Sequence, residues 1–89
     1  MMTLLFLIDG RVQGVGYRHF ASASAEAFDI AGWVRNLPDG RVEVVATGTE
    51  TNLRAFREQL ELGSRGSRVD RVDSREIDPS GVRGFAIRT

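Results

Sequence analysis

Several short segments of the chain have the apolar pattern of β-strands. A continuous apolar run at Leu4–Ile8 predicts a central strand buried on both faces, because a strand covered on both sides need not alternate. In Arg41–Thr47 the apolar residues alternate, which is typical of a strand with one buried face. The turn signal Pro38-Asp39-Gly40 precedes it and predicts a hairpin. The predicted strands are Leu4–Ile8, Ile30–Leu37, Arg41–Thr47, a segment from Val69 to Ile77, and, after a turn at Asp78–Gly81, a short one at Gly84–Arg88.

Two further segments have the 3.6-residue period of helices. The first spans Tyr17–Phe28 and carries small and aromatic side chains on one face. The second has apolar residues at i, i+3 and i+7; its start is expected within Gly48–Thr51 and Gly63 is a natural C-terminal stop. The residues expected to face the core are Phe20, Ser24 and Phe28 in the first helix, with Ala21, Ala25 and Ala27 around them, and Leu53, Phe56 and Leu60 in the second.

The order of these elements is β-α-β-β-α-β with a possible short fifth strand. It predicts an α+β fold of the ferredoxin-like kind, with two helices on one face of a mostly antiparallel sheet. We expect residues 1–89 to form one domain. Right-handed crossovers bring the end of the second strand, near Asn36, to the edge where the first helix begins. Two segments about 20 residues apart therefore meet at that edge.

Composition narrows the function without naming it. Twelve arginines balance twelve acidic residues, and this neutrality weakens any function that needs a broad basic surface, such as non-specific nucleic-acid binding. The absence of Lys and Cys excludes a lysine nucleophile, thiolate chemistry and disulfides. The apolar run near the start is too short for a signal peptide or a membrane span. We expect a cytoplasmic monomer that binds neither nucleic acid nor membrane, since no apolar surface stripe is evident.

The segment Gly10–Phe20, GRVQGVGYRHF, has the composition of an oxyanion-binding loop that enters a helix. Gly14 and Gly16 are suited to the curled backbone in which successive N–H groups surround an anion. The first turn of the helix adds unpaired N–H groups and a partial positive charge. Arg18 falls in that turn, where its guanidinium can grip two phosphate oxygens. The segment is not a Walker loop, because no Gly-Lys-Ser/Thr follows, and its glycine spacing differs from the dinucleotide fingerprint.

This segment and a second one, GWVRNLPDGRVEV at Gly32–Val44, together resemble the acylphosphatase family, and a weaker resemblance continues to Phe85–Ile87. The resemblance implies hydrolysis of the carboxyl–phosphate bond of small acyl phosphates. We expect no cofactor, and no metal, since one His and scattered carboxylates lack the spacing of metal ligands. The resemblance also implies that backbone amides of the loop and Arg18 bind the phosphate group of the substrate, and that Asn36 orients the attacking water. The same loop is expected to bind inorganic phosphate or a similar oxyanion. The loop residues that the resemblance implicates are Gln13, Gly14, Val15, Gly16, Tyr17 and Arg18.

Some residues near these segments are not expected to take part in catalysis. His19 follows Arg18 on the helix and is expected to point elsewhere, in a solvated or packing role. On a strand Arg35 should face away from Asn36. Trp33 is expected to pack near the hairpin. The Ser-Arg-Gly-Ser run after Gly63 stands where family members often have Pro and Ala, and it is expected to form a loop distal to the chemistry.

Other functions stay open for this fold, which also serves RNA-binding and ligand-sensing modules. An RNA-binding sheet needs exposed aromatic residues on its inner strands, and Arg41–Thr47 has none. A ligand-sensing module is usually accompanied by a second domain. A third possibility is a phosphate-binding domain without activity.

Overall fold

Five strands and two helices follow one another in the order that the sequence predicts. The computed structural model describes residues 1–79 and 81–89, so the turn expected at Asp78–Gly81 lies partly outside the described residues. The elements are β1 (Met2–Arg11), α1 (Tyr17–Ala27), β2 (Ala31–Asn36), β3 (Val42–Gly48), α2 (Glu50–Leu62), β4 (Arg68–Ile77) and β5 (Phe85–Arg88).

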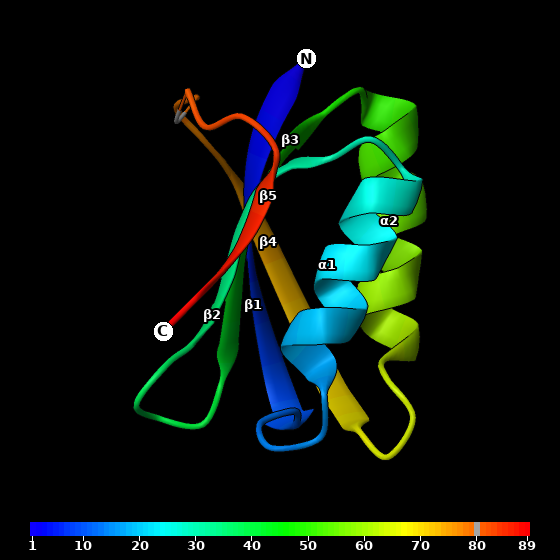
Figure 1. Ribbon diagram of the computed structural model, residues 1–89, viewed down its shortest axis with the longest axis vertical. Helices are drawn as coiled ribbons and strands as arrows, with labels where there is room; N and C mark the ends of the chain where they lie inside the picture. The colour runs from blue at the N-terminus through cyan, green and yellow to red at the C-terminus, as the bar shows by residue number, and fades with distance from the viewer. Residues whose placement is uncertain (80) are drawn as a thin grey trace.

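The strands form one sheet in the order β4-β1-β3-β2-β5. All neighbouring strands are antiparallel except β2 and β5, which run parallel. Both helices pack against the same face of the sheet, and the other face is open (Figure 1). The predicted ferredoxin-like α+β fold is confirmed, and the possible fifth strand is present as β5.

Strand β1 is longer than expected and is covered by helices on one face only. It continues through Gly10 and Arg11, which the sequence assigned to an irregular loop. A register shift just before Gly10 lets the strand stay paired with β4. A side chain at Gly10 would collide with the β4 backbone, so glycine is the residue that this position of β1 can accommodate. Leu5 and Leu7 lie on the open face and are only partly buried, so the expectation of burial on both faces is wrong.

The core lies between the helices and the covered face of the sheet. Helix α2 buries Leu53, Phe56 and Leu60 as predicted. Helix α1 buries Ala21, Ser24 and Ala25 of the predicted face, while Phe20 and Phe28 are partly buried and pack against the core, and Ala27 is exposed. Small side chains at the centre of the contact let α1 approach the sheet closely, and the larger rings then lie at its flanks. The residues that α1 buries are Tyr17, Ala21, Ser24 and Ala25.

Three connections meet at one end of the molecule. They are the β1–α1 loop, the β2–β3 turn and the α2–β4 loop, all at the bottom of Figure 1. The β2–β3 turn is closed by a hydrogen bond of 2.8 Å from the Leu37 N–H to the Arg41 carbonyl oxygen. The predicted functional residues lie at this end.

Candidate active site

The β1–α1 loop has the backbone of an anion-binding turn. Gly14 and Gly16 have φ values of 74° and 76°, in the left-handed region that favours glycine. Gly16 is the N-cap of α1, and no side chain caps the helix. The first N–H groups of α1 have no acceptor within the helix and point out of its end, where the helix dipole is positive. The loop and the helix start together therefore favour a bound anion.

A small pocket of about 130 Å³ opens at this helix end. Its volume is several times the roughly 30 Å³ that a water molecule takes up in the liquid. His19 is among the residues that line it, and the residue is exposed, which agrees with the solvated role expected of it. The residues that line the pocket are Val12, Gly14, Gly16, Tyr17, Arg18, His19 and Asn36.

Asn36 reaches this pocket from the last position of β2, opposite Val42. Its side-chain oxygen Oδ1 is buried and has no hydrogen-bond partner among the residues that the structure describes. A buried amide oxygen without a donor is costly, so the Asn36 amide keeps hydrogen-bonding capacity for a water or ligand in the pocket that this residue lines. Arg35 faces the other way, as predicted, and its Nε lies 2.7 Å from the Glu43 carboxylate.

The guanidinium of Arg18, a residue that lines the pocket, is held by the last strand. Its Nη1 donates a hydrogen bond of 3.0 Å to the backbone carbonyl oxygen of Arg88 in β5. The Arg88 side chain extends over the open face instead, with its guanidinium carbon 4.1 Å from the centre of the Trp33 ring. One residue of β5 therefore links Arg18 to a packed aromatic side chain, which agrees with the packing role expected of Trp33.

The side chains of Gln13 and Tyr17 bind other parts of the protein. These two residues therefore offer only their main-chain groups to an anion in the loop. Gln13 Nε2 donates to the carbonyl oxygens of Leu37 and Arg41, at 2.8 and 2.9 Å, and so ties the loop to the β2–β3 turn just beyond Asn36. The Tyr17 hydroxyl donates to the Leu60 carbonyl oxygen at 2.7 Å. Burial raises the pKa of this phenol well above its ordinary value. These braces join residues far apart in the chain, and no local pattern in the sequence indicates them.

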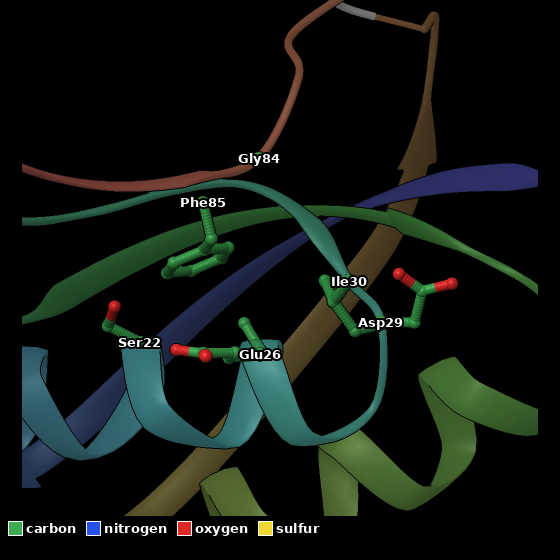
Figure 2. Close-up of a pocket in the computed structure, with 7 residues that line it drawn as sticks. Ser22, Glu26, Asp29, Ile30, Gly84 and Phe85 are labelled. Carbon is green, nitrogen blue, oxygen red and sulfur yellow. The ribbon is translucent and has the colours of Figure 1, made fainter.

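A second and larger pocket, of about 280 Å³, lies at the other end of α1 (Figure 2). Ser22 and Glu26 line it from the helix, Asp29 and Ile30 from the turn that follows, and Phe85 from β5. Two carboxylates there would repel an anionic ligand. None of the predicted site residues lies in this pocket, so the smaller pocket is the candidate active site.

The comparisons with known proteins agree with one another. The family model named Acylphosphatase matches residues 4–87. An acylphosphatase of Thermus thermophilus is 45% identical over 87 residues, which cover 98% of this chain and 99% of that protein. The crystal structure of an acylphosphatase from Bacillus subtilis matches with a TM-score of 0.97 and 40% identity over 100% of both chains. The structure of an acylphosphatase from Coxiella burnetii matches with a TM-score of 0.93 and 32% identity, over 98% of this chain and 92% of that one.

Proposed function

The chain belongs to the acylphosphatase family and hydrolyses the carboxyl–phosphate bond of acyl phosphates, and we propose that Arg18 and Asn36 are its catalytic residues. In this proposal Arg18 and the backbone of Gln13–Arg18 hold the phosphate, and Asn36 holds the attacking water. The observation that carries it is that Asn36, whose Oδ1 has no hydrogen-bond partner among the described residues, lines the same pocket as Arg18 and the open end of α1.

The phosphate is recognised by charge and by backbone geometry. The loop N–H groups and the guanidinium surround the phosphoryl oxygens, where negative charge is concentrated as the bond to the acyl group breaks. Because the backbone of the loop glycines and the helix dipole are fixed before the substrate arrives, the N–H groups around the phosphate need little reorganisation at the moment of reaction. The side chains that line this pocket in the described chain are apolar, neutral or basic, so no carboxylate repels the phosphate.

The water is oriented by hydrogen bonding and needs no strong base. An amide is not a base at neutral pH, but Asn36 Oδ1 accepts a hydrogen bond from the water and aims its oxygen at phosphorus. The bond from water to phosphorus forms while the bond from phosphorus to the acyl oxygen breaks, and the electron pair leaves with the carboxylate. The proton of the water passes to an oxygen of the transferred phosphate. A pH–rate profile that requires a protein group titrating near neutrality would contradict this last step.

Hydrolysis of benzoyl phosphate by three variants tests the residue roles. Arg18→Ala and Asn36→Ala are each expected to reduce kcat/KM by about 100-fold or more, the usual effect of losing one charge-stabilising or positioning contact. Arg35→Ala is the matched control, because this exposed arginine neighbours Asn36 but pairs with Glu43 on the open face. Full activity in both Arg18→Ala and Asn36→Ala would overturn the proposal.

We also propose that residues 1–89 act as one domain, a cytoplasmic monomer whose partners are small acyl phosphates and inorganic phosphate. Neutral net charge gives no general attraction to nucleic acid or to anionic lipid. Within the described part of the chain, no helix is long and apolar enough to cross a membrane. The large apolar side chains most exposed there are Met1, which precedes β1, Leu62 at the end of α2 and Ile87 in β5, three separate parts of the chain. Light scattering during size-exclusion chromatography tests the monomer, and a dimer mass would contradict it.

A further inference from the structure

We propose that Ser64 is a positioning residue that holds the phosphate-binding loop in its active shape. This inference rests on the proposed function of that loop. Ser64 lies in the α2–β4 connection, 49 positions after Val15 in the chain. Its Oγ donates a hydrogen bond of 3.2 Å to the Val15 carbonyl oxygen. The expectation that the Ser-Arg-Gly-Ser run is distal to the chemistry is therefore wrong at its first residue.

The contact matters because the carbonyl of Val15 and the N–H of Gly16 belong to one peptide unit. A peptide unit is planar and trans, so its C=O and N–H point in opposite directions. When Ser64 holds the carbonyl toward the α2–β4 connection, the Gly16 N–H is turned away from it. Gly16 lines the candidate pocket, and its φ of 76° lies in a region that residues other than glycine rarely adopt. Ser64 therefore fixes the rotation of a peptide unit at the pocket wall.

A second hydrogen bond from the other side of Gly16 ends on the same segment. The Tyr17 hydroxyl donates to the Leu60 carbonyl oxygen in the last turns of α2. The two neighbours of Gly16, Val15 and Tyr17, are thus both held by residues 60–64. The end of α2 and the connection after it therefore hold the residues on both sides of Gly16, and Ser64 makes the contact with the loop backbone.

Ser64 is itself held in place by hydrogen bonds to its backbone. The N–H and the Oγ of Ser67 both donate to the Ser64 carbonyl oxygen, at 3.0 and 2.7 Å. Gly63 ends α2 with a φ of 80°, and a Cβ there would lie 2.5 Å from Ser67 Oγ. The tight turn from Gly63 to Ser67 therefore fixes the backbone of Ser64. Alanine or proline at position 64 has no hydroxyl and could not make this contact.

The test compares wild type with Ser64→Ala, Ser64→Thr and Arg65→Ala. The measured quantities are KM and kcat for benzoyl phosphate, the inhibition constant of inorganic phosphate, and the temperature of unfolding. Ser64→Ala is expected to raise KM and the phosphate inhibition constant together by about fivefold, which corresponds to about 1 kcal/mol, the usual net value of one hydrogen bond. Its kcat should stay within about twofold, because the loop holds phosphate in the ground state as well.

The conservative variant and the control separate positioning from folding. Ser64→Thr keeps the hydroxyl and is expected to restore phosphate affinity to within about twofold of wild type. Arg65 is exposed in the same turn, and Arg65→Ala should behave as wild type. A Ser64→Ala variant that unfolds at a lower temperature with unchanged KM and phosphate affinity would overturn the inference, since a merely structural serine would do that. Calorimetric titration with phosphate decides the role of Ser64 even if wild type hydrolysed no acyl phosphate, a result that would instead overturn the proposed function.

Discussion

Arg18 and Arg88 are joined by a hydrogen bond between a guanidinium and a backbone carbonyl, 70 positions apart in the chain. The contact uses Nη1 of Arg18 and leaves its remaining N–H groups for other acceptors. A long, flexible side chain loses rotamer freedom when it binds substrate, so fixing it beforehand lowers the cost of binding. Strand β5 thus contributes to the candidate active site although no β5 side chain lines it.

Removing the last two residues tests this contact. A chain that ends at Ile87 lacks the Arg88 carbonyl oxygen, and kcat/KM for benzoyl phosphate is expected to fall about tenfold, the effect of losing one hydrogen bond to a charged group. Arg88→Ala retains the carbonyl and removes only the stacking on Trp33. That variant should lose about 0.5–1 kcal/mol of unfolding free energy, with kcat/KM close to wild type. Equal loss of activity in both variants would show that the side chain, and not the carbonyl, is what matters.

Gln13 connects the two halves of the candidate site, because its amide spans the carbonyl oxygens of Leu37 and Arg41. Gln13→Ala leaves both acceptors without this donor, and the free energy of unfolding should fall by about 1–2 kcal/mol. Since the loop and Asn36 lose their common brace, kcat/KM should fall as well. Urea denaturation and a hydrolysis assay measure the two effects. Gln59→Ala on α2 is the matched control, and a stability loss equal to that of Gln13→Ala would argue against the brace.

Tyr17 makes the stability of the fold sensitive to alkaline pH. Burial raises the pKa of its phenol far above the ordinary value of 10.0, so the folded protein keeps a proton that the unfolded chain loses. The free energy of unfolding is therefore undiminished below about pH 10 and decreases as the pH rises above it. Tyr17→Phe removes this dependence, although it costs about 1 kcal/mol at neutral pH through the lost hydrogen bond to Leu60.

The absorbance of tyrosinate checks this prediction directly, because Tyr17 is the one tyrosine of the chain. Between pH 10 and 12 the tyrosinate signal should appear together with unfolding seen by circular dichroism. A phenol that ionises in the folded protein near pH 10 would refute the prediction.

Gly16 and Gly81 separate the effect of backbone strain from the effect on phosphate. Both have positive φ, 76° and 72°, and a Cβ at either would meet nothing within 4 Å. Alanine at either position should cost about 1–2 kcal/mol of stability through the left-handed backbone alone. Only Gly16→Ala is expected to raise the inhibition constant of inorganic phosphate as well, because Gly16 lines the pocket. Equal phosphate affinity in the two variants would indicate that the loop does not bind the anion.

Local patterns in the sequence determined the elements and the chemical character of the site. The apolar spacing of Leu53, Phe56 and Leu60 produced a helix with that buried face, and Gly14 and Gly16 took the left-handed backbone expected of them. The handedness of crossovers was enough to bring Asn36 to the helix end that carries Arg18. These features follow from the intrinsic preferences of neighbouring residues and from general rules of chain topology.

Tertiary structure alone decided how the site is held. Strand β1 extends through Gly10 because β4 pairs with it there, and the buried face of α1 depends on how closely its alanines approach the sheet. Ser64 meets Val15, and Arg18 meets Arg88, through hydrogen bonds between atoms that are near only after folding. A hydrogen bond depends on separations of a few tenths of an ångström, and the packing of the whole core sets those distances.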